Sequence, residues 1–265
     1  MRFFLTIFLM IWGAFVQADS TLEVYFSNDS INGFQLSDAY ETHNMGLRYT
    51  DGPHIVSLDL GIVSPDMLVY RNQFRHANRS YGEIATVSYV NALENIPNVS
   101  AGLYIKGSGK LGLNKAQAFA HKLFKLAKVD EINELVRMPD QTWFGVIANY
   151  ETNPKKENNT EKLYSFGTNL GSDKGSFKGE VNYRKRMSKF NLNISYGAEF
   201  VPYNHVVSSE PIRAKHRKIN PIVTLGIETK LAEMDLYVSQ RLSLPTISED
   251  DSIYAVVTAG VRYNF

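Results

Sequence analysis

The chain ends, from Ile253 to Phe265, in the stretch IYAVVTAGVRYNF. Every second residue of this stretch is apolar or aromatic: Ile253, Ala255, Val257, Ala259, Val261, Tyr263 and Phe265. The positions between them include Thr258, Gly260, Arg262 and Asn264. Because successive side chains of a β-strand point to opposite faces, the stretch predicts a strand with one apolar face and one more polar face.

The same alternation recurs upstream, and this recurrence predicts a barrel in a membrane. We expect about twelve strands, an even number as in bacterial barrels, near 21–29, 43–50, 54–63, 82–92, 98–106, 142–152, 161–169, 174–185, 189–201, 217–230, 232–244 and 252–265. The terminal Phe265 resembles the C-terminal signature of bacterial outer-membrane proteins. We therefore expect an all-β fold, a transmembrane antiparallel β-barrel. The alternative, a soluble periplasmic β-sandwich, does not need an apolar face on nearly every strand.

The N-terminal segment has the features of a secretory signal peptide spanning residues 1–18. Arg2 precedes an apolar run, and Val16-Gln17-Ala18 forms a small-residue cleavage site. An uncleaved anchor is the alternative. Residues 19–265 then form a single outer-membrane β-barrel domain. In such a barrel, the polar residues that face the interior lower the average hydropathy of every sequence window. This explains the mean hydropathy of −0.22.

Composition excludes several classes of function. The chain has 28 Lys and Arg against 27 Asp and Glu, and cleavage after residue 18 removes one Arg and no acid. The mature chain therefore carries 27 basic and 27 acidic residues. A net charge near zero does not indicate a nucleic-acid partner. The absence of cysteine excludes disulfides, thiol catalysis and thiolate metal sites.

Three segments interrupt the alternation and are candidates for function. The first is the Arg-containing segment 64–81. The second, 107–141, predicts a short helical insertion near 113–136 at one rim, either as a lid or as a plug of the lumen. The third is the polar loop 202–216. Basic residues at its end either meet anionic lipopolysaccharide or are simple surface charge: Arg213, Lys215, His216, Arg217 and Lys218.

Two places in the sequence carry residues suited to chemistry. Gln117 and His121 are four residues apart and share one face of the predicted helix. A histidine there is either an ordinary partly buried residue or a base near neutral pH. Asn28 and Asp29 end the first strand, where they are either hydrated rim residues or oxygen ligands for a hard cation such as Ca²⁺.

These residues fall within motifs that resemble the outer-membrane lipid A 3′-O-deacylase family, the LpxR-like proteins. The resemblance runs from about Leu22 to Glu151. It rests on Ser27-Asn28-Asp29, Met45-Gly46-Leu47, Val63-Ser64-Pro65, Asn78-Arg79-Ser80-Tyr81 and the stretch GSGKLGLNKAQAFAHKLF from Gly107 to Phe124. The last is similar to a family signature that contains Q-x-x-x-H. The resemblance implies a twelve-stranded barrel that removes the 3′-linked acyloxyacyl chain of lipid A.

The resemblance also implies roles for individual residues. His121 is expected to activate water against the acyl ester, and Gln117 to orient His121 or the water. Asn28 and Asp29 are expected to help hold a Ca²⁺ that stabilises the oxyanion. Arg79 is expected to contact lipid A phosphates.

The sequence departs from the family pattern at several positions. The family has an active-site Thr in the second strand. Depending on how the family pattern is aligned with this sequence, either Asn44 or Thr42 stands at that position. Asn78 stands where the family has Asp. An acidic residue expected after the histidine is not in register, and Glu131 and Glu134 are only candidates for it.

We therefore expect a carboxylic ester hydrolase in the bacterial outer membrane, with Ca²⁺ as cofactor and lipid A of lipopolysaccharide as substrate. The alternative is a non-catalytic barrel, either a small porin or a lipopolysaccharide-binding protein. An outer-membrane phospholipase is less favoured, because no serine is suitably placed near His121. A monomer is expected, although nothing in the sequence specifies the oligomeric state.

Overall fold

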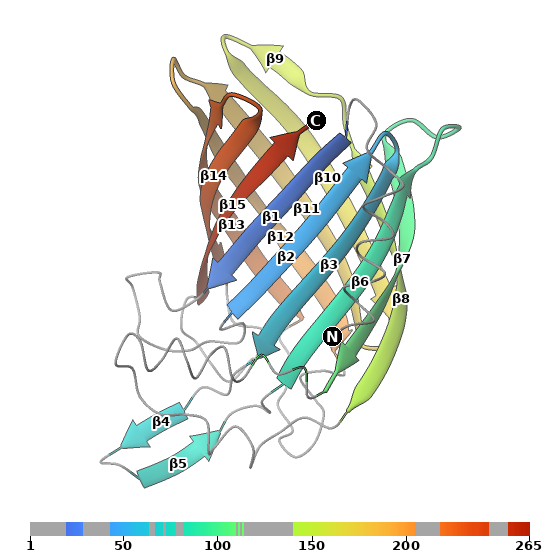
Figure 1. Ribbon diagram of the computed structural model, residues 1–265, viewed down its shortest axis with the longest axis vertical. Coiled ribbons are helices and arrows are strands. Elements are labelled where there is room, and N and C mark those ends of the chain that lie inside the picture. Colours follow the sequence, from blue (N-terminus) through green and yellow to red (C-terminus); the bar gives the residue numbers. More distant parts are fainter. Residues whose placement is uncertain are drawn as a thin grey trace.

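A closed antiparallel β-barrel of twelve strands forms the protein in the computed structural model (Figure 1). The structure describes residues 20–28, 43–63, 67–70, 73–77, 82–109, 111, 113, 140–204, 218–243 and 254–265. The barrel strands are β1 (Ser20–Asn28), β2 (His43–Asp51), β3 (His54–Val63), β6 (Gly82–Ala92), β7 (Val99–Ser108), β8 (Gln141–Glu151), β10 (Thr160–Gly171), β11 (Lys174–Arg186), β12 (Asn191–Asn204), β13 (Ile219–Leu231), β14 (Met234–Ser243) and β15 (Tyr254–Asn264).

Neighbouring barrel strands pair in chain order, and β15 closes the ring on β1. The twelve-strand prediction is confirmed, and each barrel strand overlaps its expected range. Three short strands were not predicted. β4 (Met67–Tyr70) and β5 (Gln73–Ala77) form a separate hairpin within 64–81, and β9 (Lys155–Glu157) pairs with the start of β10 beyond the barrel wall.

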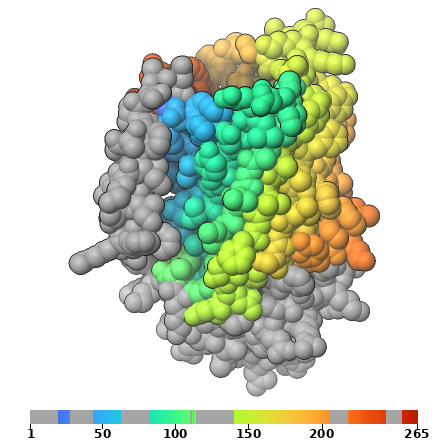
Figure 2. All heavy atoms as spheres, turned by 90° about the vertical axis from the view of Figure 1, so that its right-hand side faces the viewer, coloured from blue at the N-terminus to red at the C-terminus, as the bar shows by residue number. Residues whose placement is uncertain are grey.

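The predicted alternation of faces is also confirmed. On β1, Val24 and Phe26 are 45% and 44% exposed, whereas Glu23 and Ser27 between them are buried. The same outer face carries exposed apolar side chains on the other barrel strands, among them Leu103, Phe144, Phe166, Tyr196, Leu225, Val238 and Val261. Figure 2 shows one side of the barrel wall, including β6 and the strands that follow β8. An apolar outside and a polar inside suit a barrel surrounded by lipid.

The connections divide the barrel into two different ends. At the end where the chain leaves β15, the links are short, such as Gly52-Pro53 between β2 and β3 and Ala232-Glu233 between β13 and β14. At the other end, the segments 29–42, 64–81, 109–140, 205–218 and 244–253 join the strands. Outer-membrane barrels have short periplasmic turns and long extracellular loops, so the β1 start and the C-terminus mark the periplasmic end.

Several predictions concern residues outside the described part. The signal peptide 1–18 lies there, as does the 202–216 loop from residue 205 on. Of the helix predicted near 113–136, the structure describes only Leu113, which is helical. Among the described residues, no helix is long and apolar enough to cross a membrane.

Candidate functional site at the extracellular rim

The predicted site residues belong to the extracellular ends of β1 and β2 and to the segments that follow the strands at that end. Asn28 is the last residue of β1, and Asn44 is the second residue of β2. Asp29, Thr42, Arg79, Gln117 and His121 lie outside the described residues. Their predicted roles therefore stay predictions, and the geometry of the rim is given by its described neighbours.

Asn44 faces the barrel interior at this rim. It stands opposite Ser27 of β1 and Gly61 of β3, whereas the next residue, Met45, is 51% exposed on the outer face. The carboxamide oxygen of Asn44 is buried and has no hydrogen-bond partner in the described part of the chain. A buried acceptor of this kind needs a donor or a cation, because an unsatisfied polar atom is costly. The oxygens of Asn91, Asn169 and Asn220 share this property within the described residues, so what distinguishes Asn44 is its place opposite Ser27 at the rim.

Glu83 connects the barrel to the segment that carries the predicted helix. Its carboxylate accepts a hydrogen bond from the backbone N–H of Leu113 at 3.1 Å, and its carbonyl accepts one from Gly109 at 3.1 Å. The side chain is 2% exposed. Glu83 nevertheless shares its strand face with Val87 and Tyr89, which are 41% and 45% exposed. The backbone of Leu113 therefore contacts a side chain that belongs to the outward-facing register of β6.

Asn44 and Glu83 lie at nearly the same height on strands separated only by β3. Asn44 pairs with Gly61, and the next residue of β3, Ile62, pairs with Glu83. Two interstrand spacings place their backbones about 10 Å apart. The structure thus brings the starts of β2 and β6 together at one rim, with Asn44 on the inner face and Glu83 on the outer face.

A buried polar cluster lies inside the barrel at the same end. Asp173, in the turn between β10 and β11, is 2% exposed and pairs with Lys106 of β7 at 3.0 Å. The hydroxyl of Tyr104 also donates to Asp173. Burial works against ionisation of Asp173, but the Lys106 ammonium and these hydrogen bonds outweigh it and hold the pKa of the carboxyl below its ordinary value. These contacts hold the charged and aromatic side chains of the cluster in fixed positions in the lumen near the extracellular rim.

A second polar network occupies the periplasmic half of the lumen. Glu23 is 5% exposed and pairs with Arg48 at 3.0 Å and Arg262 at 3.3 Å. These arginines come from the strands on either side of β1, so the network spans the closure of the barrel. Beside it, the hydroxyl of Tyr25 donates to Asp59.

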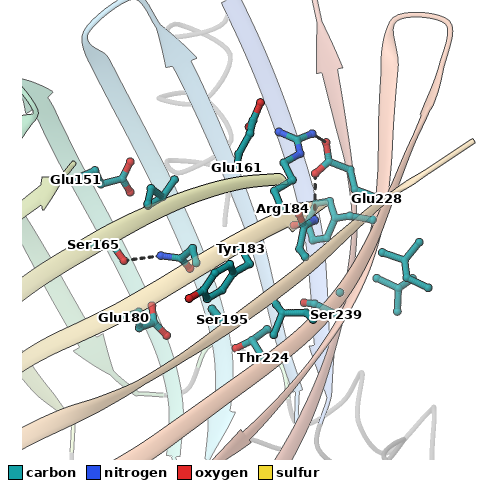
Figure 3. Close-up of a pocket in the computed structure, with 18 of the residues that line it drawn as sticks. Glu151, Glu161, Ser165, Glu180, Tyr183, Arg184, Ser195, Thr224, Glu228 and Ser239 are labelled. Carbon is teal, nitrogen blue, oxygen red and sulfur yellow. Dashed lines mark hydrogen bonds and ion pairs between the residues drawn. The ribbon is translucent and has the colours of Figure 1, made fainter. Parts of the chain in front are cut away.

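Two cavities, of about 550 and 900 Å³, adjoin this network. Both are lined by Glu151, Leu163, Ser165 and Glu180. Figure 3 shows the smaller one, where Arg184 pairs with Glu228 at 2.8 Å and Asn182 donates to Ser165 at 2.9 Å. Most acids here have a basic partner, which suits a hydrated, charge-balanced interior more than a reaction centre.

The described residues by themselves do not form a metal centre: no group of three or more His, Cys, Asp or Glu side chains among them is placed to hold a metal. The donor chemistry at the rim nevertheless fits calcium. The oxygen of Asn44 without a hydrogen-bond partner is of the type that Ca²⁺ binds, and it faces Ser27, directly before Asn28 and Asp29.

Reasoning from the sequence missed Glu83, Lys106 and Asp173. Glu83 could have been noticed as a carboxylate at an otherwise apolar position of its strand. Lys106 and Asp173 are 67 residues apart, and no local pattern links them.

Comparison with solved structures supports the fold. LpxR from Salmonella typhimurium superposes with a TM-score of 0.71 at 12% identity, covering 92% of this chain and 100% of that one. The NanC porin gives a TM-score of 0.48 at 6% identity, covering 93% and 100%. The translocator domain of the autotransporter NalP from Neisseria meningitidis gives 0.45 at 9%, covering 97% and 92%. No family model and no curated protein sequence matches the chain.

The likeness to LpxR at this identity concerns the fold. Together with the closed barrel and its apolar outer face, it places this chain in the bacterial outer membrane, as an outer-membrane β-barrel with the fold of LpxR.

Proposed function

We propose that the protein is a lipid A 3′-O-deacylase that hydrolyses an acyl ester at the outer-leaflet end of the barrel. The sequence motifs resemble the LpxR-like family, and the fold is similar to LpxR over that protein's whole length. The observation that carries the proposal is the orientation of Glu83. Because its carboxylate accepts a hydrogen bond from Leu113, the segment leading to Gln117 and His121 begins at the extracellular end of β6, next to a side chain of the outward register.

This position suits a lipid substrate. Lipid A occupies the outer leaflet, so it can reach by lateral diffusion a site at the rim that is open towards the outer side. A site confined to the lumen would require the acyl chains to leave the membrane. The contact of Leu113 with a side chain of the outward register therefore favours a lid-like helix at the rim over a plug, the two alternatives that the sequence left open.

The proposed reaction is hydrolysis with water as nucleophile. His121 accepts a proton from the water, whose oxygen attacks the ester carbonyl carbon. The bond between the acyl carbon and the sugar oxygen then breaks, and the protonated His121 returns its proton to the leaving alkoxide. The released acyloxyacyl acid loses its own proton to solvent and departs as a carboxylate. Gln117 orients His121 or the water, and Arg79 contacts a lipid A phosphate.

Asn28 and Asp29 would hold calcium, with Asn44 or Thr42 beside them. When bound there, the ion supplies positive charge for the oxyanion of the ester. Of the two candidates, Asn44 is the one that the structure describes. It faces inward beside Ser27, and its buried oxygen has no partner among the described residues. The site is thus built from β1, β2 and the segment after β7.

A non-catalytic barrel is the second candidate function, and the two lumen cavities favour it. They share one wall, lined by Glu151 and Glu180, and could hold a water-filled passage. Towards the extracellular end, however, Tyr104, Lys106 and Asp173 project into the lumen as a cluster of paired groups and narrow it. Single-channel recordings of the wild-type barrel test this alternative, since a porin conducts steadily and a filled barrel does not.

The experiment for the deacylase is mass spectrometry of lipid A from a host membrane carrying the wild-type chain. We expect loss of the 3′-acyloxyacyl mass, and we expect a calcium chelator to abolish that loss while magnesium is kept present. A host carrying the empty vector is the control. Unchanged lipid A in every sample, with the barrel folded and inserted, would overturn the enzymatic proposal.

Glu83 offers a more specific test of how the site is held. We expect Glu83→Ala to lower acyl release at least about tenfold, because the segment before His121 loses its anchor and small displacements of catalytic groups are costly. Glu83→Gln keeps an oxygen that accepts from Leu113 and should retain most activity. Equal loss in both variants would show that the charge of Glu83, not its hydrogen bond, matters.

A further inference from the structure

A cluster of lysine and tyrosine side chains lies on the outer face of β10, β11 and β12 near their periplasmic ends. The Lys162 ammonium lies 5.1 Å from the ring centroid of Tyr164 and 5.3 Å from that of Tyr183. Tyr183 in turn stacks on Tyr196, with centroids 6.0 Å apart and ring planes at 22°. We call these four residues, with Lys155 and Lys185, the Lys–Tyr cluster.

The register of the strands shows that the cluster faces outward. Lys162 pairs with Tyr183, and Tyr164 pairs with Val181, which is opposite Tyr196. Tyr196 is 48% exposed, in line with the apolar outer belt. Lys155 of β9 pairs with Lys162 and so shares its face, and Lys185 follows on the outward register of β11. The β9–β10 hairpin rises beyond the barrel wall, at the top of Figures 1 and 2.

The positive charge of the cluster is not neutralised by the described part of the chain. No ion pair joins Lys155, Lys162 or Lys185 to a described carboxylate. The nearby Glu161 faces the lumen, where it pairs with Lys156 at 3.6 Å and Arg186 at 2.8 Å. Glu157 shares the outward register, but it stands opposite Thr160 at the hairpin tip.

One observation indicates that an anion belongs here, and a second places the cluster near the membrane interface. Lys155 and Lys162 stand directly opposite each other across β9 and β10, an arrangement that is destabilising unless a counter-charge lies between them. A lysine on a lipid-facing surface is also costly except near the interface. Lys162 is the third residue of β10, so its Cα lies about 7 Å from the periplasmic start of that strand.

We propose that the Lys–Tyr cluster binds the headgroup of an anionic phospholipid in the inner leaflet. Phospholipid phosphates lie at this depth, and clustered basic residues beside a membrane-spanning segment attract anionic lipids. The tyrosine rings hold the Lys162 ammonium at the interface through cation–π contacts, and their hydroxyls can donate to phosphate oxygens. The site is on the opposite side of the membrane from the proposed ester-hydrolysing rim and is independent of that function.

Native mass spectrometry of the mature barrel in detergent tests this proposal. Phosphatidylglycerol, phosphatidylcholine and inorganic phosphate are titrated separately, and phosphate is also added as a competitor. We expect phosphatidylglycerol to bind more tightly than phosphatidylcholine. Lys162→Gln should weaken its binding about fivefold, as expected for one basic residue at the membrane surface. Lys155→Gln, on the projecting hairpin, should weaken it without any effect on barrel folding.

Lys156→Gln is the matched control, because it removes the same charge from the same hairpin on the lumen side. Its affinity for phosphatidylglycerol should equal that of the wild type. Equal binding of the two lipids, or equal losses in Lys156→Gln and Lys162→Gln, would overturn the proposal. Displacement of the lipid by millimolar phosphate would identify a site for free phosphate instead of a lipid site.

Discussion

Replacement of His121 by alanine is expected to lower acyl release from lipid A by a factor of about 10² to 10⁴, the range that a positioned general base contributes. Without the imidazole, no group on the predicted helix face takes the proton from the attacking water. Gln117, four residues earlier, can orient water but cannot accept its proton. The remaining rate would come from substrate binding and from the calcium ion that we propose.

The measurement is lipid A mass spectrometry over a time course, with equal amounts of folded protein in each membrane. His54→Ala provides a matched control, since it removes an imidazole that lies at the periplasmic turn and contacts Tyr89 at 2.8 Å. This variant should release acyl chains at the wild-type rate. A folded His121→Ala barrel with wild-type activity would exclude His121 as the base and would move the search to other residues of the rim.

The strands were predictable because lipid and lumen impose opposite requirements on neighbouring residues. Val24 and Phe26 alternate with Glu23 and Ser27 in the sequence, and the structure places them on opposite faces. β9 escaped prediction because Lys155–Glu157 has no apolar face. It forms because Asn158 and Asn159 adopt positive φ angles of 45° and 62°, which allow a tight turn back into β10.

The rim was only partly predictable. The sequence analysis placed Asn44 in the second strand, and the structure shows that it faces inward opposite Ser27 near the end of β1. The contact between Glu83 and Leu113 could not be predicted, because it depends on how the segment after β7 folds back across β6. The pairing of Lys106 with Asp173 depends on the register of several successive strands, which no single strand specifies.

That buried pair gives the largest expected effect on stability. Asp173→Asn leaves the Lys106 ammonium, which is 21% exposed, without its carboxylate partner. Breaking a buried pair from one side costs about 3 kcal/mol, because the remaining charge stays desolvated. We expect the free energy of unfolding in lipid vesicles, measured by urea titration, to fall by about that amount at pH 7. Lys106→Met in the same background should recover part of the loss, since it removes the isolated charge.

The pH dependence of this loss provides an independent check. Because the pKa of Asp173 in the folded protein lies below its ordinary value of 3.8, its ionised form stabilises the fold fully above that value. The stabilisation is lost as the pH falls through the lowered pKa. The difference between wild type and Asp173→Asn should therefore be constant from pH 7 to about pH 5 and shrink towards zero in stronger acid. A difference that persists unchanged there would mean that Asp173 acts through its shape and hydrogen bonds, and not through its charge on Lys106.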